Sequence, residues 1–410
     1  MIDIRELRRD PDRFVAALAR KRAEQIGREL LRVDAAWRTA TAEVESLRAQ
    51  QNQQTSKPSK EKLQQLAHRK EQLQKAQTAL SELERQRKDL LDRAPNPPAD
   101  DVPDGGEDDF TVLREVGERP SFNFPVRDHL ELTETSGLID MTRGTKVSGS
   151  RFAFRVGDVA LLELALYRFA LERAGLQGHV AILPPVLVRK EAMYGTGFFP
   201  TDAINIYGIE HEDLYLAGTS EVPLAAFHSA EILDELPRRY VAHSTCFRRE
   251  AGAAGKDTRG MFRVHQFDKV EMFVYCHPEA SRAEHDRVLA IEESMVQELG
   301  LPYRVINTAA GDLGVPAVKK YDIEAWFPGQ ERYREITSTS NTTDFQARRL
   351  NVQFRQNGSL EYVHTVNGTA ITARAMLAIL ENFQDADGSM AVPKALWEFG
   401  APRKLGARRA

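Results

Sequence analysis

The sequence contains only two cysteines, Cys246 and Cys276, among 410 residues. They form no C-x-x-C pair and have no histidines at metal-binding spacing, so a disulfide framework and a structural zinc site are not predicted. Both cysteines are expected to be core residues.

Long apolar runs are also missing. No run reaches the length of about 18 residues that a membrane-spanning helix needs, and the first residues, MIDIRELRRD, alternate charged and apolar side chains. Neither a membrane span nor a secretory signal is therefore predicted, and the cytoplasm is the expected location. The net charge of −4 gives no overall sign of nucleic-acid binding, although Arg403–Arg409 forms a local basic cluster.

The N-terminal part does contain two long segments with coiled-coil spacing. Apolar residues of the first recur at intervals of three and four: Leu30, Val33, Trp37, Ala40, Val44 and Leu47. Those of the second continue the seam: Leu66, Leu73, Ala76, Leu80, Leu83 and Leu90. A break at Gln54–Ser59 contains Pro58, so the segments are predicted to fold back as an antiparallel two-helix coiled-coil arm over residues 26–93. Such an arm could reach a large substrate, or serve as a dimerisation or scaffolding rod.

The rest of the chain is predicted to be an α+β body. Residues 94–124 are rich in Pro, Asp and Gly and read as a linker with one short strand, Phe110–Val116, so domains are expected at 1–103 and 104–410. Val159–Leu176 has a helical apolar stripe. Short apolar runs bounded by turns are predicted as strands: Val180–Leu183, Leu214–Leu216, Arg239–Phe247, Val270–Tyr275, Leu301–Asn307, Tyr321–Trp326 and Val352–Phe354. Their irregular spacing favours a mostly antiparallel sheet flanked by helices.

One segment of this body combines arginines with a glycine-rich loop. Cys246–Glu250 (CFRRE) is predicted to lead through Ala251–Gly260 into a returning strand, Met261–Tyr275. The arginines could bind phosphate bidentately and Phe267 could stack on a base. A salt-bridged hairpin with a charged tip is the alternative.

Two further segments could contribute to a site. Gly368–Arg374 (GTAITAR) is predicted to open the apolar helix Ala375–Phe383, with Arg374 in its first turn, although a surface arginine would look the same. Tyr333–Asn341 places a carboxylate among hydroxyls, which could hold Mg²⁺ or form an ordinary polar strand.

Taken in order, these phrases resemble the bacterial-type seryl-tRNA synthetases over essentially the whole chain. The matching phrases are VSGSRF (147–152), TSEVPL (219–224), FRREAG (247–252), DTRG (257–260), HQFDKVE (265–271), YREITS (333–338), NTTDFQARR (341–349) and LENFQ (380–384). The resemblance implies a class II aminoacyl-tRNA synthetase core. It also implies a homodimer interface in the helix from Val159 and the strand that runs to Pro184 and Pro185. The arginine-rich hairpin would be the second family motif, and the strand and helix around Arg374 would be the third.

The implied reaction is serine plus ATP giving seryl-adenylate and pyrophosphate, followed by transfer to the terminal ribose of tRNA(Ser). Whether tRNA(Sec) is also a substrate stays open. The implied cofactors are ATP and Mg²⁺, and the arm would recognise the tRNA by shape and backbone contacts.

The resemblance also assigns site residues. Arg248, Arg374 and Glu335 would be catalytic. The ATP site would comprise Arg248, Arg249, Glu250, Val264, Phe267, Glu335, Ile336, Thr337, Ser338 and Arg374. The serine site would comprise Thr219, Ser220, Glu221, Arg248, Glu271 and Thr369. Glu335 and Ser338 would ligate Mg²⁺. Asn367 and Arg374 stand one residue closer together than in many family members.

Two other functions are conceivable for a chain with these motifs. A ligase that loads an amino acid onto a carrier protein typically lacks the arm, which is complete here. A non-catalytic RNA-binding paralogue should have lost Arg248, Glu335 or Arg374, and all three are present. Whether this is the sole enzyme of its kind in its cell or an inhibitor-tolerant second copy stays open.

Overall fold

The computed structural model describes residues 1–52, 60–251 and 260–406. The chain forms two compact units, Met1–Pro97 and Pro98–Ala410. The break lies earlier in the chain than the predicted position between 103 and 104. Val102 belongs to the second unit, where it clusters with Ala310 and Leu313.

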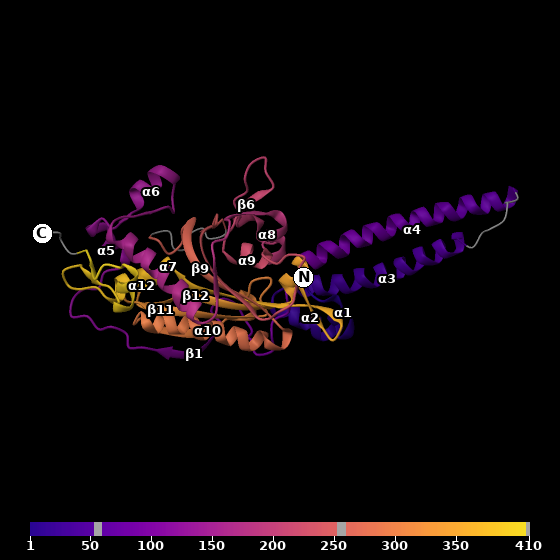
Figure 1. Cartoon of the computed structure of the whole chain (residues 1–410). Helices are drawn as coiled ribbons and strands as arrows, with labels where there is room; N and C mark the ends of the chain where they lie inside the picture. Colours follow the sequence, from indigo (N-terminus) through magenta and orange to yellow (C-terminus); the bar gives the residue numbers. More distant parts are fainter. Residues whose placement is uncertain (53–59, 252–259, 407–410) are drawn as a thin grey trace. The chain divides into compact units, whose positions relative to one another are not determined.

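The first unit contains four helices in its described part: α1 (Ile4–Arg9), α2 (Pro11–Arg20), α3 (Glu24–Asn52) and α4 (Lys60–Arg93). Helices α3 and α4 lie side by side along most of their lengths, which confirms the predicted helical arm (Figure 1). Leu30, Val33, Val44 and Leu90 of the predicted seam are buried. The predicted break around Pro58 lies outside the described residues.

A buried carboxylate joins three of these helices. Asp34 of α3 is 2% exposed. Arg8 of α1 donates to both of its oxygens at 2.8 Å, and Arg87 of α4 donates to Oδ1 at 2.8 Å. The Arg87 guanidinium also lies 4.6 Å from the centre of the Trp37 ring. Burial alone would raise the pKa of Asp34, but hydrogen bonds from both arginines outweigh it and lower that pKa.

Replacing Asp34 by asparagine should therefore destabilise the base of the arm by about 2 kcal/mol at neutral pH, the typical worth of a hydrogen bond to a charged group. Hydrogen exchange of α1 and α3 peptides in the full chain would measure the difference. Because the folded pKa of Asp34 lies below its ordinary value of 3.8, its contribution should be complete above about pH 4 and lost as the pH falls further. A difference that persists unchanged at pH 2 would contradict the ionic account.

The second unit is built on an eight-stranded sheet with the strand order β1-β10-β11-β12-β15-β9-β8-β4. The strands are β1 (Thr111–Val116), β10 (Tyr303–Asn307), β11 (Lys319–Phe327), β12 (Arg332–Thr343), β15 (His364–Thr372), β9 (Gln266–Cys276), β8 (Arg238–Phe247) and β4 (Val180–Ile182). All neighbouring pairs are antiparallel except β4 with β8. The predicted mostly antiparallel α+β body is confirmed.

Two local predictions were wrong. Gly368–Thr372 does not begin a helix but completes β15, because Thr369, Ile371 and Thr372 are β-branched residues that favour extended backbone. The helix α12 begins only at Ala373, where the Thr372 hydroxyl accepts the Arg374 N–H at 3.2 Å. Met261–His265 is irregular, so the predicted returning strand begins at Gln266.

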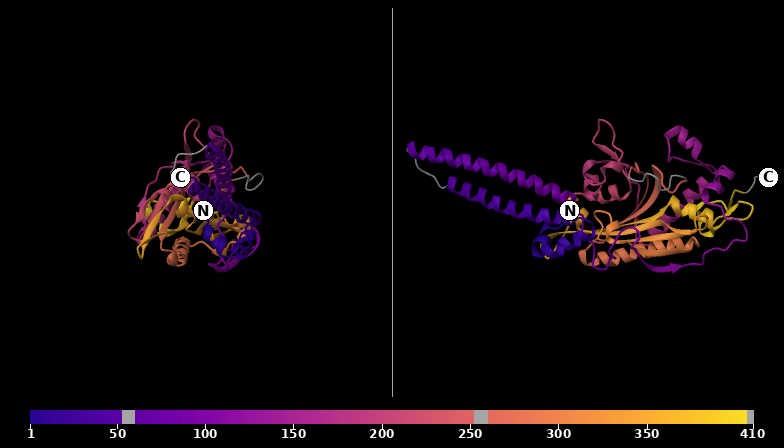
Figure 2. Two further views of the ribbon diagram at one scale, coloured as in Figure 1. Left: turned by 90° about the vertical axis from the view of Figure 1, so that its right-hand side faces the viewer. Right: turned by 180° about the vertical axis from the view of Figure 1, so that it is seen from behind.

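The sheet separates two hydrophobic clusters. Alternate residues of β9, including Val270, Met272 and Val274, cluster with helices α7 (Asp158–Leu176) and α10 (Ser281–Glu298). Helix α10, drawn in orange, runs along the sheet in Figure 1 and in the rear view of Figure 2. The intervening Phe273 and Tyr275 belong to the second cluster. Side chains of β9 thus alternate between two faces.

Further elements of this unit are α5 (His129–Ser136), α6 (Met141–Ser148), α8 (Lys190–Thr196), α9 (Glu221–Ala226), α11 (Phe345–Leu350) and α12 (Ala373–Asn382), with short strands β2 (Ile139–Asp140), β3 (Phe154–Arg155), β5 (Leu187–Arg189), β6 (Leu214–Leu216), β7 (Ile232–Leu233), β13 (Gln353–Gln356), β14 (Ser359–Tyr362), β16 (Met390–Ala391) and β17 (Lys404–Leu405). Cys246 and Cys276 are buried and unpaired, as predicted for core residues. Of the helices in the described ranges, none combines the length and apolar character needed to cross a bilayer.

Candidate active site

A cavity of about 790 Å³ lies against the central strands β9, β12 and β15. The first turn of α12, residues on both sides of the β8–β9 connection, and residues within 196–206 and 313–317 complete its walls. The predicted site residues that line it are Glu221, Arg248, Glu250, Val264, Phe267, Glu335, Ile336, Thr337, Ser338, Thr369 and Arg374. Segments far apart in the sequence therefore meet around one space.

Arg248 stands directly after β8, with its guanidinium 5.5 Å from the centre of the Phe267 ring. Its Nε donates to the Gly218 carbonyl oxygen at 3.1 Å, which fixes the direction of the side chain. Nearby, Arg263 donates to Glu250 Oε2 at 2.6 Å. This ion pair joins the segment that follows β8 to the segment that precedes β9. This part of the cavity offers a fixed cation beside an aromatic face.

Arg374 and Glu335 form an ion pair across the cavity wall. Arg374 Nη1 lies 3.4 Å from Glu335 Oε2 and donates to the Glu335 carbonyl oxygen at 3.1 Å. Burial raises the pKa of Glu335, but the positive charges of Arg374, Lys320 and Arg248 outweigh burial and lower it. Glu335 is therefore ionised at neutral pH. The cationic side chains around it could also bind the phosphates of a nucleotide.

The other part of the cavity is a polar network around two carboxylates. Glu221 Oε1 accepts hydrogen bonds from Gln346 Nε2 at 2.7 Å and Asn367 Nδ2 at 2.8 Å. Burial and the neighbouring charge of Glu271 raise the pKa of Glu221 to about 7. A ligand ammonium group would favour its ionised form.

Glu271, Lys269 and Thr369 form the second half of this network. Lys269 makes a close ion pair with Glu271 Oε2. The Thr369 hydroxyl donates to the same oxygen at 3.3 Å and accepts from Lys269 at 3.4 Å. Thr369 therefore meets Glu271 even though the segment from Asn367 to Arg374 is the shorter form.

Four predicted site residues do not line the cavity: Thr219, Ser220, Arg249 and Glu271. Thr219 Oγ1 accepts the Glu221 backbone N–H at 3.2 Å, so it orients a residue that does. The buried Ser220 hydroxyl is 2.6 Å from that of Ser244. Arg249 is exposed, and Glu271 lies behind Lys269 and Thr369.

Sequence reasoning missed several residues that the structure adds to the cavity or its network: Arg263, Lys269, Lys320, Gln346 and Asn367. Lys269 carried a usable signal, because Phe267, Lys269 and Glu271 alternate along β9 and must share a face. Lys320 pairs with Asp322 at 3.0 Å and has no comparable signal in its local pattern.

A magnesium ion fits this cavity only together with a ligand. Across the described ranges, no group of three or more His, Cys, Asp or Glu side chains could hold a metal by itself. Glu335 and Ser338 nevertheless both line the cavity and offer oxygen donors. Mg²⁺ is commonly held by one or two carboxylates together with substrate phosphates.

Comparisons with known proteins match both units. Residues 1–98 match the model of the seryl-tRNA synthetase N-terminal domain, and residues 207–383 match that of the tRNA synthetase class II core domain (G, H, P, S and T). Serine–tRNA ligases from Thermobifida fusca and Nocardia farcinica are 50% and 51% identical to this chain, and each alignment covers 97% of it and 97% or 98% of the relative.

Solved structures agree with these matches. The crystal structure of seryl-tRNA synthetase from Pyrococcus horikoshii complexed with ATP is 39% identical, with a TM-score of 0.93 and 99% of both chains covered. The cytoplasmic serine–tRNA ligase from Naegleria fowleri in complex with AMP is 32% identical, with a TM-score of 0.87 and coverage of 97% and 95%. A Giardia lamblia prolyl-tRNA synthetase, 14% identical with a TM-score of 0.58, shares the fold.

Proposed function

This chain belongs to the seryl-tRNA synthetase family of class II aminoacyl-tRNA synthetases, and on that premise we propose how its cavity activates L-serine with ATP for transfer to tRNA(Ser). The observation that carries the proposal is the division of the cavity. Arg248, Arg374 and Phe267 suit a nucleotide, and the network of Glu221, Lys269 and Thr369 suits a small amino acid.

The first step is attack of the serine carboxylate oxygen on the α-phosphorus of ATP. The bond from that phosphorus to the bridging oxygen breaks, and pyrophosphate leaves. Arg248 holds both the serine carboxylate and the α-phosphate, where negative charge builds, and Arg374 neutralises the γ-phosphate. Phe267 and Arg374 provide stacking faces for adenine. Fixed charges and positioning supply the rate acceleration, so no protein nucleophile is required.

The second step transfers the activated serine. A hydroxyl of the terminal tRNA ribose attacks the carbonyl carbon of seryl-adenylate, and AMP leaves. Glu221 holds the serine ammonium group in both steps. The Thr369 hydroxyl, which donates to the Glu271 carboxylate behind it, can accept a hydrogen bond from the serine hydroxyl, and this contact distinguishes serine from amino acids of similar size.

Glu335 and Ser338 would hold Mg²⁺ together with the ATP phosphates. The ion would neutralise phosphate charge when bound. The ion pair between Glu335 and Arg374 keeps both side chains at the cavity wall, so each is positioned before ATP arrives.

The coiled-coil arm, α3 and α4, is proposed to bind the tRNA outside its acceptor end. Protein recognition of structured RNA relies largely on shape and backbone contacts, which a long helical hairpin can supply. Since tRNA charging serves protein synthesis, we place the protein in the cytoplasm.

A homodimer is supported by apolar side chains left exposed along α7 and β4. They are Leu161, Leu164 and Leu176 of α7, Val180 of β4 and Leu183 directly after β4; Leu164 is 61% and Leu183 82% exposed. Contiguous exposed apolar surface is typical of an interaction site. Strand β4 is also an edge of the eight-stranded sheet. These features favour a second copy of the chain, bound through the predicted first motif.

Replacing Leu164 and Leu183 together by glutamate should convert the dimer to a monomer, because both charges would need to be buried at the interface. Light scattering after size-exclusion chromatography would measure the mass. The matched control is Leu360→Glu, since Leu360 is exposed on β14, which belongs to a separate three-stranded sheet. A dimer that survives the double change would refute this interface.

Serine-dependent ATP–pyrophosphate exchange with the purified chain tests the proposed function, first without tRNA and then with charging of tRNA(Ser). Exchange should require serine and Mg²⁺ together.

Ser338→Ala should raise the Mg²⁺ concentration needed for half-maximal exchange, because one oxygen ligand is lost. An unchanged Mg²⁺ requirement would contradict the role given to Ser338.

A further inference from the structure

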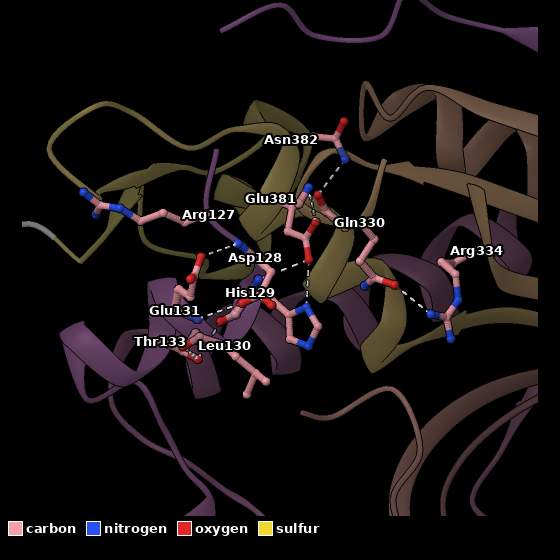
Figure 3. Close-up of polar contacts among 12 residues, drawn as sticks. Arg127, Asp128, His129, Leu130, Glu131, Thr133, Gln330, Arg334, Glu381 and Asn382 are labelled. Carbon is pink, nitrogen blue, oxygen red and sulfur yellow. Dashed lines mark hydrogen bonds and ion pairs between the residues drawn. The ribbon is translucent and has the colours of Figure 1, made fainter. Parts of the chain in front are cut away.

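A buried histidine–glutamate pair lies behind the nucleotide wall of the cavity. Glu381 of α12 is fully buried. Its Oε1 accepts from the His129 backbone N–H at 3.1 Å and from the His129 ring at Nδ1, 2.8 Å away, while its Oε2 accepts from the Gly329 N–H at 2.9 Å. Figure 3 shows the carboxylate directed at the histidine ring. Because all these donors point at one carboxylate, the Nδ1 edge of the ring is fixed toward Glu381.

The opposite ring nitrogen faces the chain that enters the cavity wall. His129 Nε2 is buried and has no hydrogen-bond partner among the described residues. A Cβ placed on Gly260 would lie 2.7 Å from Nε2, and Gly260 has φ +79°, so only glycine fits there without strain. Gly260 leads directly into Met261–Val264, which line the cavity.

The same histidine borders Phe262. Their ring centres are 5.6 Å apart, and Phe262 also meets Phe327 edge to face at 4.8 Å. The Arg334 guanidinium lies 4.0 Å from the centre of the Phe262 ring, and its Nη1 donates to Gln330 at 2.7 Å. Figure 3 shows this second contact beside the histidine pair. Phe262 is therefore held from three sides.

We propose that His129, oriented by Glu381, is a positioning residue for the nucleotide end of the cavity. With Nδ1 held against Glu381, the ring edge at Nε2 is directed at Gly260, where the absence of a side chain lets it approach closely. That approach sets the path of Gly260–Val264 and so the places of Phe262, Arg263 and Val264. The inference rests on the proposed function, since it assigns ATP to this end.

Two substitutions test the Glu381–His129 contact and the His129–Gly260 contact separately. Glu381→Gln keeps the shape but turns an NH₂ group toward one of the N–H donors, so the ring orientation is no longer enforced. His129→Asn keeps a donor for Glu381 and removes the edge that contacts Gly260. Both should raise the KM for ATP by about tenfold or more, as expected for misplacement at a distance, while the KM for serine changes less than about twofold.

The matched control is Glu131→Gln, the same chemical change as Glu381→Gln but at an exposed position of α5, the helix that contains His129. Glutamine can keep the capping contact to the Asp128 N–H, so neither KM should change. Equal KM values for ATP in the variants and the wild type, or parallel rises for ATP and serine, would show that the pair only supports the fold.

If either variant fails to fold, Gly260→Ala supplies the second test, because its Cβ would enter the contact with Nε2. Its KM for ATP should rise while its KM for serine changes less than about twofold. An unchanged KM for ATP, or parallel rises for both substrates, would overturn the inference. Calorimetry of ATP binding in the absence of serine tests the role of His129 independently of the proposed function. If the wild type binds ATP but shows no serine-dependent exchange, only the proposed function is refuted.

Discussion

Replacing Arg374 or Arg248 by alanine should slow serine-dependent ATP–pyrophosphate exchange by about 10²–10³-fold, the usual cost of losing one preorganised charge contact to a transition state. Arg248 lies beside Phe267 and Arg374 beside Glu335, so each presents its charge to the cavity rather than to the core. The variants should keep the thermal stability of the wild type to within a few degrees, because neither side chain is fully buried.

The matched control for these variants is Arg355→Ala, the same change at an exposed position of β13 outside the cavity. Exchange by this control should equal that of the wild type. Near-normal exchange by the Arg248 or Arg374 variant would remove that residue from the mechanism.

Shortening the arm should strongly reduce tRNA charging and leave serine-dependent exchange within about twofold of the wild type. The structure shows where to cut. Asp34, Trp37 and Arg87 join the helices at the base, and Gly27 lies against Val15 and Leu18, so this part must stay. Deleting Thr41–Leu80 and joining Ala40 to Ser81 with a short glycine–serine linker removes only the distal part.

Charging should fall by about 10²-fold or more because the tRNA loses the contact that orients its acceptor end. If the shortened enzyme charges tRNA normally, the arm is a scaffold or dimerisation rod. If exchange is lost as well, the catalytic unit depends on the distal arm, and the prediction that exchange does not need the arm is wrong.

The sequence predicted those parts of the fold that depend on local periodicity. The three-four spacing identified α3 and α4, and the apolar runs located most strands of the sheet. The local pattern gave a wrong prediction at Gly368–Thr372. The apolar residues that follow suggested a helix, but this segment has β-branched side chains and pairs with β9, so it forms a strand. Asp34 could not be predicted, since a polar residue in a helix gives no sign of partners on α1 and α4.

The site could be predicted where the residues that interact belong to the same sequence motif. Phe267 and Arg248 are close in the chain and meet in the hairpin. In contrast, Glu221 is held by Gln346 and Asn367, and His129 by Glu381, which come together only when the sheet forms. No spacing rule in the chain connects these pairs, so their geometry had to come from the structure.

The central claim is that this cavity activates serine, and ATP–pyrophosphate exchange measured side by side with serine, threonine, alanine and glycine tests it most directly. A network built to bind a hydroxyl should prefer serine over alanine or glycine by about 10⁴-fold or more, because those amino acids leave its polar groups unpaired. Threonine must be refused by sterics and should be discriminated less strongly. Exchange with another of these amino acids at an efficiency comparable to that with serine would contradict the account.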